Sequence, residues 1–427
     1  MLWLMVEVRV AAISSGRTMA ETDAAPQDAT PAPSAFDAIT RDDLGLPLPD
    51  DTQFAYLNRS GRPEAGRVRE LIDAWFAEYP AEHRKTLIGR FRSSIDDEHR
   101  SAFFELFLHH LVVARGGKVL AVEPKLDHTD KSPDFLVESA AGEQYYLEGV
   151  MATGRSTRET AAHARLNTAL AAIDATPAPD HFLDLTVHGL PSTPVATKKL
   201  KRALRSWIAG LPKDETAKDA PGFRYEDHGM TILLKAWTRS RPAGDDARAI
   251  GVRHFPVTQI APSQDVHGAL KKKASRYGKL DRPYLVAVNA LGHHQREDAV
   301  FDALLGTPYV SISRTASGEE KVEERRATDG IWYGPPDGQP QNTGLSGVMA
   351  FRQIDPWNFA GRTGVLVPNP SAAKPLLETG FGIDEFKIVD GTYRRTEGEP
   401  MSALLKLPAQ WPGDQPEPVA PPDQAAD

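Results

Sequence analysis

The chain has no cysteine among its 427 residues, which excludes disulfide bonds, thiolate metal sites and a cysteine nucleophile. It has no uninterrupted apolar run of about 18 to 20 residues, the length that a membrane-spanning helix needs. The patterns GxxxxGK[ST], GxGxxG after a strand, HExxH and GxSxG are also missing, and these would indicate nucleotide-driven motors, dinucleotide enzymes, zinc proteases and serine hydrolases. The start of the chain lacks the basic leader of a signal peptide. Together these absences predict a cytoplasmic protein with no membrane partner.

Charge is distributed unevenly along the chain. The net charge is −8, but residues 21–51 carry eight acids and one arginine, and residues 408–427 carry four acids and no base. The rest of the chain is therefore slightly positive. Both acidic segments are rich in alanine and proline, which favours disorder. We therefore expect disordered segments at 1–51 and 408–427, a first domain at 52–215 and a second region at 222–407.

The most informative pattern is a hairpin that brings two carboxylates together. Two apolar-rich runs, 133–138 and 143–150, flank a short stretch of small residues ending in Gly142. If the turn centres on Ala141, residues whose numbers add to 282 face each other, and this pairs Asp134 with Glu148. Like charges directly opposed on a sheet are destabilising. The pair predicts either access to water or a bound divalent cation.

A third carboxylate lies upstream in an apolar helix pattern. Residues 101–115 are largely apolar and are followed by Gly116 and Gly117, which are typical of a helix C-terminus. Glu105 lies inside this pattern, and glutamate is rarely buried without a partner. Two interpretations stay open: Glu105 is paired or bound to metal, or it shares a solvated stripe with His109.

The order of these elements resembles the PD-(D/E)xK nuclease superfamily, which has a restriction-endonuclease-like fold. The resemblance covers roughly residues 95–190 and rests on Glu105, the dipeptide Pro133-Asp134 and Glu148. It implies an α/β protein with an α-β-β-β-α-β core around a mixed sheet, here followed by a C-terminal α+β extension. The core would end with a helix at about 158–173 and a strand at 181–187. One position departs from the family motif, because Val150 stands where the family has lysine.

The resemblance implies a nuclease that uses Mg²⁺ or Mn²⁺ to cut DNA. Asp134 and Glu148 would hold the metal, with Glu105 and the Gly149 carbonyl as further ligands. Since Val150 cannot activate water or stabilise negative charge, another cation is needed, and the candidates are Lys125, Lys131, Arg155 and Arg158. Alternatively the metal alone is sufficient, or the site is inactive and the fold binds nucleic acid or a protein.

Two basic amphipathic helices are candidate nucleic-acid contacts. One, at 197–211, carries Lys198, Lys199 and Arg202, and the other, at 265–279, carries Lys271, Lys272 and Arg276. Lysine and arginine along one helix face contact phosphates without reading sequence. The alternative for both helices is a solvated charged face without a ligand.

Overall fold

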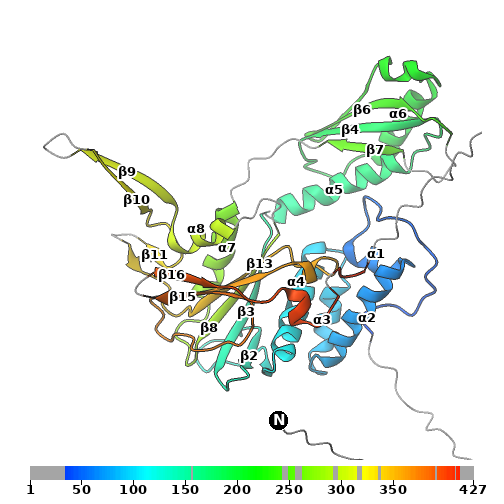
Figure 1. Cartoon of the computed structure of the whole chain (residues 1–427). Coiled ribbons are helices and arrows are strands. Elements are labelled where there is room, and N and C mark those ends of the chain that lie inside the picture. Colours follow the sequence, from blue (N-terminus) through cyan, green and yellow to red (C-terminus); the bar gives the residue numbers. More distant parts are fainter. Residues whose placement is uncertain are drawn as a thin grey trace, which may run out of the picture. The chain divides into compact units, whose positions relative to one another are not determined.

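The computed structural model describes residues 34–154, 157–242, 249–254, 262–291, 297–314, 320–334, 338–389, 392–408 and 410–413 (Figure 1). The described residues belong to one compact unit, Ser34–Asp427. Ala35 and Phe36 are buried in a hydrophobic core. These two residues fall in the segment 1–51 that was expected to be disordered, and they are ordered because their apolar side chains pack in this core.

Four helices open the described chain: α1 (Gln53–Arg59), α2 (Pro63–Glu78), α3 (Arg84–Phe91) and α4 (Asp96–Ala114). Thr52 caps α1 by accepting a hydrogen bond from the Ala55 N–H at 3.1 Å, and Pro63 suits the first turn of α2. Acidic residues fill the first turn of α4, where they are stabilised by the helix dipole. Gly116 follows α4 with φ of +78°, as the helix-ending glycine pattern predicts.

The main sheet has the strand order β1-β2-β3-β8-β13-β14-β15-β16. Its strands are β1 (Lys118–Val122), β2 (Phe135–Glu138), β3 (Gln144–Ala152), β8 (Tyr284–Ala290), β13 (Gly347–Arg352), β14 (Gly364–Pro368), β15 (Asp384–Val389) and β16 (Thr392–Thr396). The pairs β3–β8, β8–β13 and β14–β15 are parallel and the others antiparallel, so the sheet is mixed. The expected mixed α/β class is confirmed.

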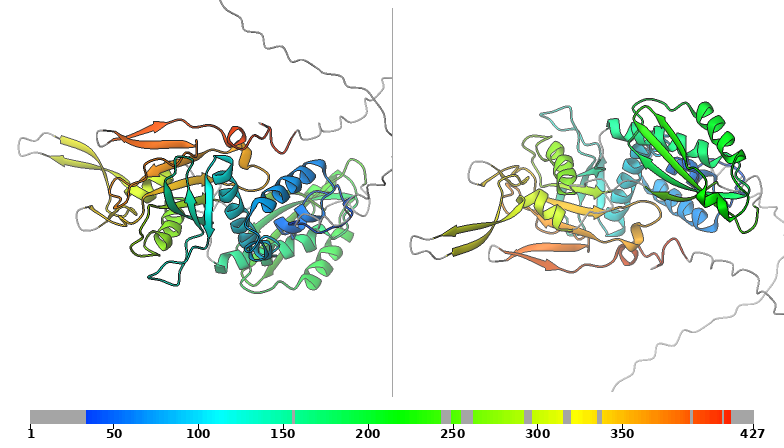
Figure 2. Two further views of the ribbon diagram at one scale, coloured as in Figure 1. Left: turned by 90° about the horizontal axis from the view of Figure 1, so that it is seen from below. Right: turned by 90° about the horizontal axis from the view of Figure 1, so that it is seen from above.

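The two faces of the main sheet belong to different hydrophobic cores (Figures 1 and 2). Tyr145 and Leu147 on β3 pack with the N-terminal helices, including α4. Tyr146 packs with the core of α7 (Pro262–Ala274) and α8 (Glu297–Leu305), and Val150 lies against the same core. Because side chains alternate along a strand, Glu148 lies on the α7 face.

A second, four-stranded sheet has the order β5-β6-β4-β7 and its own core. It comprises β4 (His181–His188), β5 (Phe223–Asp227), β6 (Met230–Thr238) and β7 (Ile250–His254), with α5 (Thr157–Asp174), α6 (Thr197–Ala209) and a 3₁₀ helix (Glu215–Asp219). The expectation that strand 181–187 completes the core around β3 is therefore wrong. Strand β4 pairs with β6, and the buried face of β4 packs on α5 and α6. The parallel neighbour of β3 is β8.

The remaining elements are short or project from the main sheet. Strands β9 (Pro308–Arg314) and β10 (Glu320–Arg326) form a separate hairpin (Figure 2), and β11 (Tyr333–Gly334) pairs with β12 (Gln339–Pro340). A 3₁₀ helix (Phe359–Gly361) and the short α9 (Met401–Leu404) complete the list of elements. Within the described ranges, no helix combines the length and apolar character needed to cross a membrane.

Candidate functional site: a carboxylate cluster beside a lysine

The predicted hairpin register is confirmed. Phe135 pairs with Leu147 and Glu138 pairs with Gln144, so the paired residue numbers add to 282 throughout β2 and β3. Asp134 directly precedes β2, and this register places it across from Glu148. The turn residues Ser139 and Gly142 fix the register, since the Gly142 N–H donates to the Ser139 carbonyl at 2.9 Å.

Asp134 and Glu148 are joined through backbone groups. The Asp134 N–H donates to Glu148 Oε2 at 3.1 Å, and the Gly149 N–H donates to Asp134 Oδ2 at 2.6 Å. These bonds fix each carboxylate against the strand that carries the other one. Among the described residues, no protein group donates a hydrogen bond to Asp134 Oδ1.

Helix α7 supplies the cation that β3 lacks. Lys273 Nζ forms an ion pair with Glu148 Oε1, and the side chains of Lys273 and Glu148 are 19% and 1% exposed. One turn later, Tyr277 donates its hydroxyl to Glu148 Oε2 at 2.7 Å and approaches the Ser132 carbonyl at 2.9 Å. Glu148 and Val150 lie on the sheet face that α7 covers. A lysine from α7 therefore reaches the carboxylate from the side on which a lysine at position 150 would lie.

A signal for Lys273 was present in the sequence. Val266, Leu270 and Tyr277 are buried and form the apolar stripe of this helix region, and Lys273 falls on the same stripe. A charged residue on an apolar stripe needs a buried partner. Sequence reasoning instead treated the helix only as a basic surface.

Glu105 is held on the opposite side of the sheet by one hydroxyl donor and one cation. Tyr79 donates its hydroxyl to Glu105 Oε1 at 2.7 Å, and Arg90 pairs with Oε2 at 2.6 Å. His109 is buried rather than solvated, and burial lowers its pKa to about 4. The expectation of a solvated Glu105–His109 stripe is therefore wrong, because α2 and α3 cover this face of α4.

Negative charge accumulates at Asp134. Burial, the Glu148 carboxylate and the Glu105 carboxylate raise the pKa of Asp134 well above its usual range, in that order of importance. The Gly149 N–H and the Lys273 ammonium act in the opposite direction. Part of the Asp134 side chain still reaches solvent. The cluster is therefore a partly open site in which an additional cation would relieve repulsion.

Gly149 allows α4 and the hairpin to approach each other. A Cβ at this position would lie 3.2 Å from Leu108 Cδ1 and 3.3 Å from Asp134 Oδ2. Any larger residue would push on the carboxylate or on the helix. Its N–H holds Asp134, whereas its proposed role as a carbonyl ligand to a metal stays a prediction.

The other predicted cations lie elsewhere. Lys125 and Lys131 are exposed, and no ion pair joins either of them to the cluster in the described structure. Arg158 is exposed at the start of α5, and Arg155 lies outside the described residues. The lysine at the cluster is thus Lys273, because α7 packs directly on β3.

The two basic helices have different surroundings. Lys271 and Lys272 are exposed next to Lys273 on α7, and Arg276 is exposed in the turn that follows, since α7 ends at Ala274 and not at 279 as expected. Lys198, Lys199 and Arg202 are exposed on α6, which belongs to the four-stranded sheet. Of the two groups, only Lys271, Lys272 and Arg276 belong to the chain segment that contacts the carboxylates.

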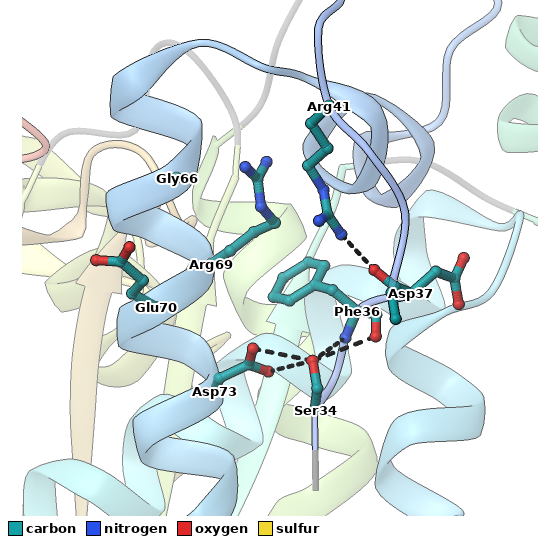
Figure 3. Close-up of a pocket in the computed structure, with 9 residues that line it drawn as sticks. Ser34, Phe36, Asp37, Arg41, Gly66, Arg69, Glu70 and Asp73 are labelled. Atoms are coloured by element: carbon teal, nitrogen blue, oxygen red, sulfur yellow. Dashed lines mark hydrogen bonds between the residues drawn. The ribbon is translucent and has the colours of Figure 1, made fainter. Parts of the chain in front are cut away.

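A separate pocket of about 390 Å³ lies between residues 34–41 and α2 (Figure 3). Its charged groups already have partners: Asp73 accepts from the Ala35 N–H at 2.6 Å, and Arg41 donates to the Asp37 carbonyl at 2.6 Å. Arg69 donates to two backbone carbonyls. The pocket shares no residue with the carboxylate cluster, so we place the candidate chemistry at the cluster.

Comparison with known proteins returned no matching family model, no matching curated protein and no matching solved structure. In the part of the chain that is described, no three acidic or histidine side chains are already grouped as metal ligands. The function is therefore inferred from the carboxylate cluster itself.

Proposed function

We propose that this protein is a metal-dependent nuclease whose active site consists of Asp134, Glu148 and Lys273. The observation that carries the proposal is a buried carboxylate, Glu148, that is ion-paired with a lysine and faces a second carboxylate, Asp134, whose pKa is raised by burial and by Glu148. Structural ion pairs seldom require a second carboxylate at the same place, because it raises the electrostatic cost. Perturbed carboxylates of this kind concentrate at functional sites.

The proposed fold is a restriction-endonuclease-like core interrupted by an insertion. Helix α4, the strands β1, β2 and β3, helix α7 and strand β8 supply an α-β-β-β-α-β order, with β8 parallel to β3. The four-stranded sheet and its helices would then be inserted between β3 and α7. This assignment is supported by element order and by the direction of β8, and fold alone does not define function.

The residues of the cluster fit a hard divalent cation such as Mg²⁺ or Mn²⁺. Carboxylate oxygens are its preferred ligands, and Asp134 Oδ1 is an oxygen to which no described protein group donates. Glu148 would be the second ligand by exchanging one of its present contacts, with Lys273, Tyr277 or the Asp134 N–H, for the metal, and Gly149 would contribute its carbonyl. Glu105 is held by Tyr79 and Arg90 on the α4 side of the sheet, so we propose that Glu105 acts on the site through its charge. When bound, the metal would polarise the phosphate and lower the pKa of an attacking water.

Lys273 takes the role of the lysine that the family carries two residues after its second acid. Its ammonium would stabilise the negative charge that develops on the phosphate, and it would hold the attacking water. Tyr277 fixes Glu148 so that the carboxylate keeps its orientation while Lys273 acts. Lys271 and Lys272, exposed on the same helix, and Arg276, exposed in the turn after it, would contact the flanking phosphates of DNA.

The test is cleavage of plasmid and linear DNA with Mg²⁺ or Mn²⁺. Lys273→Met and Asp134→Asn are each expected to reduce the rate by about 10²- to 10⁴-fold, the usual contribution of a catalytic proton-transfer or charge-stabilising group. Lys118→Met is the matched control, because Lys118 is an exposed lysine on β1 of the same sheet. Unchanged cleavage by both active-site variants would refute the proposal.

A transplanted lysine makes the test sharper. The double variant Val150→Lys/Lys273→Met returns the cation to β3, on the same sheet face, and is expected to recover part of the activity lost in Lys273→Met. Recovery would assign the lysine's role to its charge at this place. The alternative function, an inactive nuclease-like module that binds nucleic acid or a protein, is favoured if wild type binds DNA but cuts no substrate with either metal.

A further inference from the structure

The four-stranded sheet has one covered face and one open face. Leu183 and Leu185 on β4, and Ile232 and Leu234 on β6, are fully buried against α5 and α6. The alternate residues of the same strands point the other way. That second face is lined by residues that are exposed or half-buried.

Two aromatic side chains lie beside each other on the open face. Phe182 and Trp237 are directly paired across β4 and β6, and they are 43% and 49% exposed. A Cβ at Gly251, on the adjacent strand β7, would lie 3.3 Å from the Phe182 ring, so glycine leaves room for this ring. The Arg239 guanidinium lies 3.7 Å from the centre of the Phe182 ring. This creates a flat surface of stacked planar groups.

The charges around these rings favour a polyanion. Lys235 is exposed on the open face two residues before Trp237, and Arg224 is exposed on β5. Asp184 and Glu226 also belong to this face, and Glu226 pairs with Arg224. The described charged side chains around the rings are three basic groups, Lys235, Arg224 and Arg239, against two acidic groups, Asp184 and Glu226, a small basic excess.

We propose that this aromatic platform (Phe182, Trp237, Lys235 and Arg239) binds single-stranded nucleic acid. Unpaired bases would stack on the Trp237 ring and on the Arg239 guanidinium that lies over the Phe182 ring, and the phosphates would lie along Lys235 and Arg224. Stacking on a flat sheet requires bases that are free of partners, which selects single strands over duplexes. The platform extends the proposed nuclease function but uses none of the residues of the carboxylate cluster, so the two can fail independently.

The experiment measures binding of fluorescein-labelled oligothymidylate to the full chain in EDTA, by fluorescence anisotropy. Trp237→Ala is expected to weaken binding by roughly 5- to 150-fold, the range for loss of one base–aromatic stack. Phe182→Ala removes the ring on which the Arg239 guanidinium rests and should also weaken binding. Trp237→Phe keeps a ring and should bind within a few-fold of wild type. Lys235→Ala should lower the slope of log Kd against log salt by about 0.7, the value for one phosphate contact to a single strand.

Two controls separate this site from others. Tyr309→Ala removes a comparably exposed aromatic from β9, and Lys118→Met removes an exposed lysine from β1; both variants should bind the oligonucleotide like wild type. A uridine oligomer and a duplex of the same length show whether the platform accepts RNA and whether it prefers single strands. Equal binding by Trp237→Ala and wild type, tighter binding of the duplex, or no oligonucleotide binding at all would overturn the proposal. The last result would indicate a protein as the occupant of the face.

Discussion

Replacing Lys273 by methionine tests the buried ion pair directly. Methionine keeps most of the length of the side chain but leaves the Glu148 carboxylate, which is 1% exposed, without its cation. Removing one partner of a buried pair costs about 3 to 5 kcal/mol, because an uncompensated charge remains. The Tyr277 hydroxyl and the Asp134 N–H still donate to Glu148, so we expect a loss near the lower end, about 3 kcal/mol.

The loss should depend on pH in a defined direction. The pKa of Asp134 is raised in the folded protein, and Lys273 is one of the groups that oppose this rise. Without Lys273 the pKa of Asp134 rises further, so protonation of Asp134 relieves the repulsion as the pH falls. Lys273→Met should therefore be most destabilising near pH 8 and progressively less so toward pH 5.

The assay is urea denaturation followed by tryptophan fluorescence at both pH values. Glu148→Gln/Lys273→Met removes both charges and should be more stable than the sum of the single variants predicts, because the single variant's penalty comes from the unpaired charge. Lys118→Met, which removes an exposed lysine, should change stability by less than about 0.5 kcal/mol. A loss below that value for Lys273→Met, or additive single and double variants, would refute the reasoning.

Three further predictions concern the same region. Gly149→Ala should destabilise the protein by about 1 to 3 kcal/mol, because the added Cβ would contact Leu108 and Asp134. Gly268 lies in helix α7 with open space around it, so Gly268→Ala should be neutral or stabilising by up to about 1 kcal/mol in the same urea assay. Asp134→Asn should raise the unfolding midpoint at pH 8, because the raised pKa of Asp134 means that its ionised form opposes folding. This gain in stability should disappear as the pH falls toward 4. An equal effect of the substitution at both pH values would contradict the prediction. Burial lowers the pKa of His109 to about 4, so its protonation should reduce the free energy of unfolding by about 3 kcal/mol between pH 6.5 and 4. Measuring stability against pH should show that His109→Phe removes this part of the loss.

Local patterns in the sequence predicted most individual elements. The helix expected at about 158–173 is α5 (Thr157–Asp174), and the hairpin register around Ala141 is confirmed. These features depend on periodicity and turn chemistry within a few residues. The predicted position of strand 181–187 was wrong because local patterns do not specify distant partners. The alternation of apolar and polar residues shows that one face of this strand is buried, but it does not show in which sheet the strand lies.

The candidate site shows the same difference between features set by local sequence and features set by tertiary packing. The opposition of Asp134 and Glu148 follows from the sequence alone, since a short hairpin fixes its own register. The cation comes from Lys273, which lies 125 residues beyond Glu148 along the chain and reaches it only because α7 packs on β3. Likewise, the partners of Glu105 come from α2 and α3, whose contact with α4 is a matter of tertiary packing. Hydrogen-bonded turns are specified locally, whereas the charge balance of a buried site is decided by which distant elements cover it.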